Sequence, residues 1–315
     1  MLIKAKGGFG NRILSAITGL IMAELGNRTP IIDWRDGVYV EPGVNLYPLL
    51  FADPLDGDPA VHDTAVDVSP PLWAGRLAAQ PRQIIAEAYP RSHSSPFIYR
   101  KLSTDLRCDP AAAVAVFWSY LPKTRRLAAR LRRDPRFAGK AIDDLVTERL
   151  TRHFTPTGPV LPAVDALFEG RKRPVIGVHI RYTDSKSPLP RIEAELRALR
   201  RRLPDSDIFL ATDNGTVQDR IMARFDRVFV IEKSLDSEGQ ALHVAAQSFA
   251  DPLQEARNAL IDMWALSRCD WLIHSRHSTF SVAAALIGGI PAARQIDVNR
   301  ANLRIVAKRW FQEYA

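Results

Sequence analysis

The chain has 315 residues, of which 46% are hydrophobic and 25% charged, so it is long enough for two folded domains and too apolar to be disordered. Its formal net charge of +8 suits an anionic ligand, a nucleic acid or an anionic membrane surface. Two cysteines and the lack of an apolar run of bilayer-spanning length exclude a disulfide framework and an integral membrane protein.

Apolar runs typical of strands alternate along the chain with stretches of helical periodicity. The expected strands lie at 2–6, 30–34, 175–181, 207–212, 228–232, 270–275 and 293–297, and the expected helices at about 11–25, 111–133, 140–153, 190–203, 214–225, 253–268, 278–287 and 300–313. This alternation predicts parallel sheets with right-handed crossovers, and therefore an α/β protein.

A turn-rich segment, "FTPTGPVLP" at 154–162, predicts the boundary between two domains. The N-terminal α/β domain is expected at 1–158, and a more regular C-terminal Rossmann-like domain at 159–315. Within the first domain, prolines divide residues 36–110 into short pieces joined by long loops.

The first candidate site is the glycine-rich stretch "GGFGN" at residues 7–11. Gly8 and Gly10 fit a dinucleotide-binding fingerprint, but its third glycine position falls on Ile13. Asp33 ends the second predicted strand, where a ribose-binding carboxylate would lie. A plain strand–helix turn and a functional loop both remain open from the residues alone.

The second candidate site follows the strand "VIGVHIR". Arg181 and Asp184 come at its carboxyl end, which is where open α/β sheets bind ligands. The planar guanidinium of an arginine suits phosphate oxygens. The alternative is a simple salt bridge between these two residues.

The third candidate site is the helix–strand–helix segment at 258–289. Asp262 interrupts the apolar helix "ALIDMWAL", where a carboxylate needs donors. Ser278 begins the second helix, either as a helix cap or as a phosphate ligand. His274 and His277 have no third ligand at zinc-binding spacing, so we expect no metal site.

Taken in order, "GGFGNRILS", "IIDWR", "VIGVHIR", "FLATD" and "ALIDMWALSRCDWLI" followed by "HSTF" resemble the blocks of fucosyltransferases. The chain is most similar to bacterial α1,6-fucosyltransferases of the rhizobial nodulation (NodZ) type. The resemblance implies a GT-B-like fold, with two Rossmann-like domains facing a cleft. It also implies an inverting, metal-independent transfer of L-fucose from GDP-fucose to a glycan, α1,6 to N-acetylglucosamine.

The resemblance further implies roles for individual residues. Arg181 would stabilise the leaving diphosphate, Asp184 is the nearest candidate base with Glu193 and Glu195 as more distant ones, and Asp262 would accept from guanine N1 and N2. The remaining donor-binding residues would be Gly8, Gly10 and Asn11 in the cleft loop, with His179, Asp213, Ser278 and Thr279.

Two departures from many relatives concern the acceptor: Tyr182 replaces a second basic residue, and Asn214 replaces a second acidic one. The alternatives are an α1,2-linking enzyme, a transferase with another donor, an NAD-dependent oxidoreductase, and a non-enzymatic anion-binding module.

We expect a cytoplasmic protein, because "MLIKAKGGFGNR" lacks a signal peptide's apolar core. Its expected acceptor is an oligosaccharide or lipid-linked glycan, with no cofactor or nucleic-acid partner and with a peripheral contact to an anionic membrane surface left open.

Overall fold

The computed structural model describes residues 1–52, 55, 57–90, 95–183, 187–235 and 249–314. The chain divides into two units, Met1–Thr155 with Lys308–Ala315, and Pro156–Ala307. The sequence placed the boundary at 158/159, three residues later, and did not anticipate that the end of the chain belongs to the first unit.

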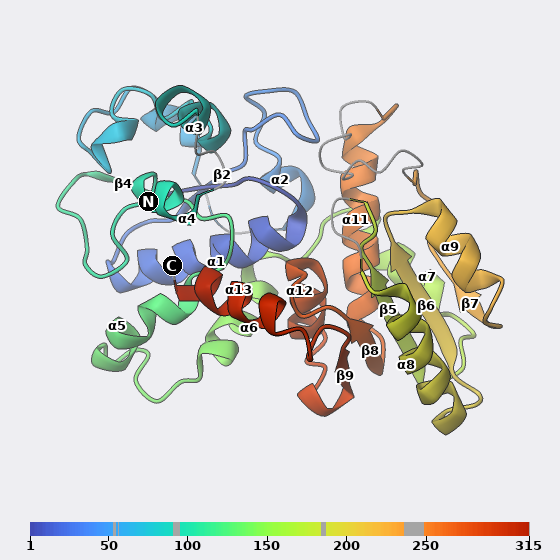
Figure 1. The fold of residues 1–315 in the computed structure, drawn as a ribbon. Helices are drawn as coiled ribbons and strands as arrows, with labels where there is room; N and C mark the ends of the chain where they lie inside the picture. The colour runs from blue at the N-terminus through green and yellow to red at the C-terminus, as the bar shows by residue number, and fades with distance from the viewer. Residues whose placement is uncertain (53–54, 56, 91–94, 184–186, 236–248, 315) are drawn as a thin grey trace. The chain divides into compact units, whose positions relative to one another are not determined.

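Unit 1 is built on a parallel sheet of order β2-β1-β4-β3. Figure 1 labels the helices of this unit from α1 to α6. Its strands are β1 (Leu2–Lys4), β2 (Ile31–Asp33), β3 (Val68–Ser69) and β4 (Val114–Phe117). The helices are α1 (Phe9–Leu25), α2 (Tyr47–Leu50), α3 (Pro81–Ala88), α4 (Pro96–Lys101), α5 (Ala128–Arg133) and α6 (Ile142–His153), with 3₁₀ turns at Pro59–His62, Pro71–Trp73 and Thr124–Leu127.

Helix α1 fills one side of this sheet. All of its residues except Glu24 are buried, because it packs on β1 and is covered in turn by α6. The other face of the sheet carries an apolar cluster that includes Trp73, Ile84 and Trp118. The sheet is therefore enclosed on both faces, as a parallel sheet requires.

Unit 2 holds a parallel sheet of order β7-β6-β5-β8-β9. Its strands are β5 (Val175–Ile180), β6 (Asp207–Thr212), β7 (Val228–Phe229), β8 (Trp271–His274) and β9 (Gln295–Asp297). The helices are α7 (Val160–Phe168), α8 (Leu189–Arg202), α9 (Gly215–Met222), α11 (Pro252–Ser267) and α12 (Thr279–Ile287), with a 3₁₀ turn at Ala292–Arg294. Helix α13 (Leu303–Tyr314) begins in unit 2, and its residues from Lys308 onward belong to unit 1.

Alternate residues of β5 face different layers of unit 2. Ile176, Val178 and Ile180 pack into a cluster with apolar residues of α8 and α9. Gly177 faces the other way, where a side chain would meet Cys269 and Leu266 at the end of α11. Helix α11 packs on β5, β6, α7 and α12, so unit 2 has the three layers of a doubly wound fold.

The α/β class and the parallel sheets are confirmed, but one predicted helix is wrong. Residues 111–133 contain strand β4, a 3₁₀ turn and the short helix α5. The run "AAAVAVFW" supplies strong helix formers, yet its buried Val114–Phe117 segment pairs with both β1 and β3. Short apolar runs fit either element, and here sheet pairing prevails over alanine propensity.

The contact between α11 and α12 depends on Gly288, which follows α12. A Cβ at this position would lie 2.0 Å from the carbonyl oxygen of Ser267, at the end of α11. Neighbouring Gly289 has a φ of +56° and open space around its Cβ position. Position 288 requires a glycine because the end of α11 approaches its backbone closely. Position 289 favours a glycine because its φ is positive.

We predict that Gly288→Ala lowers the free energy of unfolding by about 3 kcal/mol or more, because the carbonyl is backbone and cannot move aside cheaply. Gly289→Ala is the matched control and should cost only about 1–2 kcal/mol, the penalty of a left-handed backbone. Urea denaturation of both variants measures the difference. Equal losses would contradict the close packing of these helices.

Candidate functional site

The connections leaving β5 and β8 run in opposite directions, since β5 leads to β6 on one side and β8 to β9 on the other. Ligands of open α/β sheets bind outside the carboxyl ends of strands at such a switch point. Arg181 follows β5 there, and Ser278 lies at the start of α12, just after β8. The fold thus brings two of the candidate sites to one edge of unit 2.

His179 is the second-last residue of β5, and its side chain packs against α12. Its ring is buried and stacks on Phe280 with centroids 5.2 Å apart and planes 20° from parallel. Burial lowers the pKa of His179 to about 3, and the positive charge of His274, Arg181 and Lys233 adds to this effect. The imidazole is therefore a neutral hydrogen-bonding group at physiological pH.

Asp213, at the end of β6, holds the segment that follows β5. Its Oδ1 accepts from the backbone N–H of Tyr182 at 2.7 Å, and its Oδ2 accepts from the Thr183 hydroxyl at 2.7 Å. These two bonds fix the chain directly after Arg181. Asp184 lies outside the described residues.

The N-terminus of α12 lacks a side-chain capping hydrogen bond. Ser278 occupies the N-cap position but its side chain makes no capping hydrogen bond, so the pure-cap interpretation is wrong. The residue is 8% exposed. One turn on, Ser281 bonds through its hydroxyl to Nδ1 of buried His274 at 3.0 Å. A helix N-terminus with backbone N–H groups and an adjacent hydroxyl is suited to an anion.

Asp262 lies within α11 and forms an ion pair with Lys233, which comes four residues after β7. Both side chains are only 6% exposed. Oδ2 accepts from the Lys233 ammonium, whereas buried Oδ1 accepts no hydrogen bond from any residue in the described ranges. Burial raises the pKa of Asp262, Lys233 opposes this, and nearby Asp213 adds to it.

In unit 1, the glycine-rich stretch forms the turn between β1 and α1. Gly7 has a φ of +85°, and a Cβ there would lie 3.1 Å from Cε2 of Tyr120. Gly8 is the N-cap of α1, and Gly10 is within the helix. Arg12 donates to the carbonyl of Gly7 at 2.7 Å and pairs with Asp36 through both terminal nitrogens. The turn is thus a rigid one.

The dinucleotide interpretation fails at Asp33. This side chain is fully buried and pairs with Lys4 at 2.6 Å and with Arg35 at 2.9 Å. Arg35 in turn pairs with Asp63 at 2.7 Å. With both oxygens engaged inside unit 1, Asp33 has no oxygen to offer a ribose, so an NAD-dependent enzyme is not supported.

Glu193, one of the more distant candidate bases, is held by three arginines. It pairs with Arg220 at 2.6 Å, with Arg197 at 3.2 Å, and with Arg224. Burial alone would raise the pKa of Glu193, but the hydrogen bonds from Arg220 and Arg224 lower it overall. A carboxylate so stabilised is a poor base.

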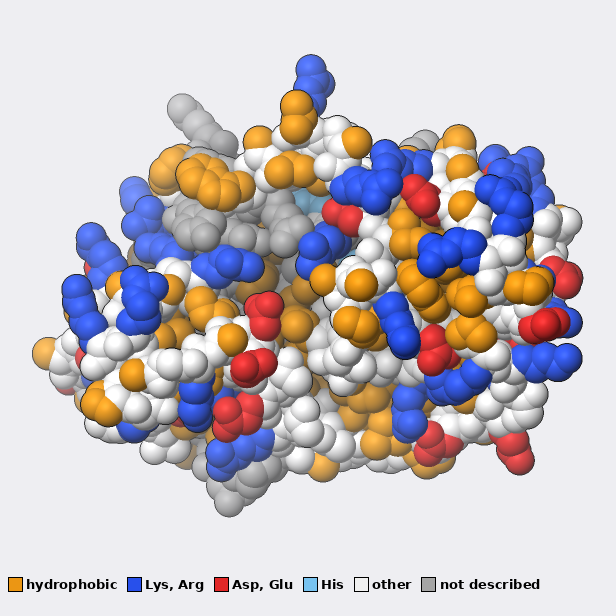
Figure 2. Space-filling model, turned by 90° about the horizontal axis from the view of Figure 1, so that it is seen from below, with side chains coloured by type: hydrophobic (Ala, Val, Ile, Leu, Met, Phe, Trp, Pro, Cys, Tyr) orange, Lys and Arg blue, Asp and Glu red, His pale blue; other side chains and the backbone are white. Residues whose placement is uncertain are grey.

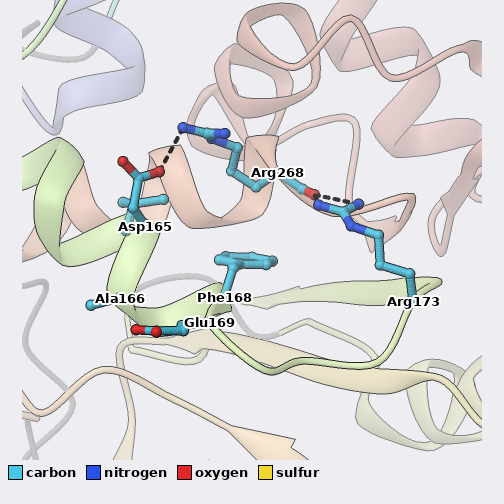
Figure 3. Close-up of a pocket in the computed structure, with 7 residues that line it drawn as sticks. Asp165, Ala166, Phe168, Glu169, Arg173 and Arg268 are labelled. Atoms are coloured by element: carbon cyan, nitrogen blue, oxygen red, sulfur yellow. Dashed lines mark hydrogen bonds and ion pairs between the residues drawn. The ribbon is translucent and has the colours of Figure 1, made fainter.

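A surface pocket of about 460 Å³ lies at the opposite end of the unit 2 sheet (Figure 3). Arg173 precedes β5 and Arg268 precedes β8, so the pocket is at the amino ends of the strands. Arg268 pairs with Asp165 at 2.9 Å and Arg173 with Asp270 at 2.9 Å. The pocket is therefore separate from the site at the carboxyl ends of the strands. Its two arginines are exposed and already paired with carboxylates.

Basic side chains on the face shown in Figure 2 are scattered and interspersed with acidic ones. On this face the described residues form no continuous basic tract for a polyanion. Within the described ranges, His, Cys, Asp and Glu form no group of three that could hold a metal ion. Nor is any described helix both long and apolar enough to cross a membrane.

Sequence reasoning missed Lys233 and Arg12. Lys233 stands in the polar stretch "VIEKS" after a weak strand, and its partner is 29 residues away, so no local pattern marks it. The signal for Arg12 was its place on an otherwise apolar helix face, where a buried cation needs partners.

Comparisons with known proteins bear on this arrangement. The family model of nodulation protein Z matches residues 140–309. Nodulation protein Z of Azorhizobium caulinodans is 26% identical over 301 residues, covering 87% of this chain and 84% of that protein. These matches include the β5 strand, α11 and α12.

Two solved structures have a similar fold. NodZ α-1,6-fucosyltransferase soaked with GDP-fucose gives a TM-score of 0.63 at 22% identity, covering 91% of each chain. The same enzyme co-crystallized with GDP gives 0.61 at 23% identity, again covering 91% of each chain. This likeness confirms the predicted GT-B-like fold class.

The state of His179 leads to a pH prediction. Below about pH 6.5 the unfolded chain protonates this histidine while the folded protein does not, so the folded state loses stability as the pH falls toward about 3. Between pH 7 and pH 5 the parent should lose about 2 kcal/mol more of its free energy of unfolding than His179→Gln. Urea denaturation at both pH values measures this, and equal losses would contradict a buried neutral imidazole.

Proposed function

The chain belongs to the nodulation protein Z family, and we propose that it is an inverting glycosyltransferase that transfers L-fucose from GDP-fucose to a glycan. The observation that carries the proposal is the carboxyl edge of the unit 2 sheet. Arg181 follows β5 there and the N-terminus of α12 follows β8, while the buried carboxylate of Asp262, one oxygen of which has no described donor, lies near enough to Asp213 for their charges to interact. This set matches a guanosine diphosphate, which is anionic at one end and carries N–H donors at the other.

In this proposal the diphosphate lies between Arg181 and the start of α12, where Ser278 and Thr279 offer hydroxyls and backbone N–H groups. Asp262 binds the base. His179 lines the nucleotide pocket, and because its buried imidazole is neutral it does not repel the nearby cation Arg181. Asp213 acts through the segment after β5, because it fixes Tyr182 and Thr183 and so the chain that carries the arginine.

The reaction breaks the bond between fucose C1 and the β-phosphate oxygen, and the electron pair leaves with GDP. The acceptor hydroxyl attacks C1 from the opposite face, so GDP-β-L-fucose gives an α-linked fucoside, and the hydroxyl proton is released. Negative charge grows on the diphosphate as the bond lengthens. In the proposal Arg181 and the positive end of α12 stabilise this charge, and such stabilisation is the main source of rate enhancement in a site of this kind.

We propose Asp184, the acidic residue closest to the motif, as the base that takes the hydroxyl proton. The environment of Glu193 argues against it, since three arginines hold its carboxylate. An oxocarbenium-like transition state makes C1 strongly electrophilic, so base assistance contributes less to the rate than leaving-group stabilisation.

We assign the acceptor to unit 1, at the carboxyl edge of its sheet. Tyr120 follows β4 and lies against the turn at Gly7. Lys6, after β1, lies 5.7 Å from the ring centroid of Tyr99 and 5.9 Å from that of Tyr120. Aromatic faces beside a half-buried cation suit a sugar chain. Gly8, Gly10 and Asn11 belong to the turn at this same edge of unit 1.

The acceptor is proposed to be an oligosaccharide or lipid-linked glycan, fucosylated α1,6 on N-acetylglucosamine. The reaction needs no metal or other cofactor, and the protein acts in the cytoplasm, with peripheral contact to an anionic membrane where the acceptor is lipid-linked. An α1,2 linkage or another donor is not favoured by the family match.

Replacing Arg181 tests the proposal most simply. Arg181→Ala and Arg181→Lys should each reduce turnover of GDP-fucose by roughly 10²–10³, because a lysine cannot meet two phosphate oxygens with one planar fork. GDP release is measured with and without a chitooligosaccharide, and circular dichroism checks the fold.

Arg191→Ala is the matched control. This arginine lies on α8, with Glu195 3.9 Å away, and its loss should leave turnover within about twofold of the parent. Addition of EDTA should change neither variant nor parent. Parent-like turnover in a folded Arg181→Ala enzyme would contradict the proposed role, as would restoration of an EDTA-treated parent by Mg²⁺ or Mn²⁺.

A further inference from the structure

Two lysines near the start of unit 1, Lys4 at the end of β1 and Lys6 just after it, have opposite surroundings. Lys4 is fully buried, and its ammonium donates to Oδ2 of Asp33 at 2.6 Å and to the carbonyl of Leu77 at 2.7 Å. Lys6 is only half-buried, and no carboxylate in the described part of the chain forms an ion pair with it. The charge of the first lysine is thus satisfied within unit 1, whereas that of the second is open to a ligand.

The ammonium of Lys6 lies beside two aromatic rings. The ring centroids of Tyr99, on α4, and Tyr120, after β4, are 5.7 Å and 5.9 Å from its Nζ. Tyr99 in turn packs edge-on against Trp118, with ring centroids 4.9 Å apart. The buried indole N–H of Trp118 meets no acceptor in the described ranges. The cluster therefore joins aromatic surface to two hydrogen-bond donors, the ammonium and the indole, that lack described acceptors.

The charge around Lys6 is positive. Burial lowers the pKa of this lysine, and the nearby guanidinium of Arg82 lowers it further. Both effects disfavour the ammonium, and the two tyrosine faces offset only part of that cost. An anion beside the ammonium would offset the rest, because an opposite charge favours the charged form. A neutral sugar hydroxyl can accept hydrogen bonds from the lysine but supplies no compensating charge.

We infer that the acceptor glycan carries an oxyanion, a carboxylate or a phosphate, which pairs with Lys6 while neighbouring sugar rings contact Tyr99 and Tyr120. The inference rests on the proposed function, since it specifies the acceptor of that same reaction. Lys6 is then a specificity-determining residue that favours anionic acceptors over neutral ones.

Three acceptors containing N-acetylglucosamine separate the charge from its source. Chitotetraose is neutral, chitobiose 1-phosphate carries a phosphate, and a hyaluronan tetrasaccharide carries carboxylates. With GDP-fucose as donor, GDP release above the acceptor-free background gives kcat/KM for each. For the parent, at least one anionic acceptor should exceed chitotetraose roughly tenfold or more, the gain expected for a hydrogen bond between charged groups. A preference confined to the phosphate indicates a phosphate-linked glycan, and one confined to hyaluronan indicates an acidic polysaccharide.

Lys6→Met keeps the apolar stem of the side chain and removes its charge, so the ratio of anionic to neutral kcat/KM should fall about tenfold. Lys6→Gln is a second neutral variant with the same expected result, and Lys6→Arg should keep the parent's ratio. Lys101→Met is the matched control, because Lys101 is exposed and lies 5.3 Å from the ring centroid of Tyr89; its loss should not change the ratio. Each ratio is taken within one protein, so a general loss of activity or stability does not alter it.

A parent that uses chitotetraose as well as both anionic acceptors would overturn the inference while leaving the proposed function intact. An unchanged ratio in folded Lys6→Met and Lys6→Gln proteins would overturn it equally. A roughly tenfold loss of GDP affinity in these variants, measured by isothermal titration, would assign the lysine to the donor instead and would also overturn it. Absence of fucosyl transfer from the parent to all three acceptors would contradict the proposed function, and the inference with it.

Discussion

Parallel pairing of β5 with β6 on one side and β8 on the other is the constraint on which the site depends. In such pairing all three strands end at the same edge, so residues from positions 181, 213 and 278 are brought together without any local sequence relation. Three layers make this edge rigid, since α8 and α9 cover one face and α11 the other. The carboxylate on α11 then faces the same region as the strand ends, as the effect of Asp213 on the pKa of Asp262 indicates.

The two units use similar sheets for different purposes. In unit 1 the buried charges satisfy one another, with Asp33 held between Lys4 and Arg35 and with Arg12 closing the glycine turn. These contacts stabilise a fixed loop. In unit 2 the buried carboxylate of Asp262 is only partly satisfied, because no described residue donates a hydrogen bond to its Oδ1. A buried carboxylate oxygen without a described donor suits ligand binding, whereas a fully paired carboxylate such as Asp33 suits a structural role.

Much of unit 2 could be predicted from the sequence because its central strands are long apolar runs bounded by turn residues. The predicted strand at 207–212 matches β6 residue for residue, and that at 175–181 is one residue longer than β5. The family blocks also directed attention to Arg181, Asp262 and Ser278, which the fold brings to one unit; their roles stay predictions. Helix 111–133 was wrong because alanine propensity concealed a strand whose pairing partners lie far away in the sequence.

Lys233 could not be predicted, because its significance lies in a buried pairing across 29 residues that no pattern encodes. Helix α7 was missed for a related reason, as the turn residues of "FTPTGPVLP" concealed the start of Val160–Phe168.

The central claim, that this chain binds a guanosine diphosphate without metal, is tested most directly by one calorimetric series. The parent protein is titrated with GDP, UDP, NAD and a short RNA, each in the presence of EDTA. The account predicts saturable binding of GDP at least tenfold tighter than that of UDP, and no binding of NAD or RNA. Equal affinity for GDP and UDP, or tight binding of NAD or RNA in place of GDP, would contradict it.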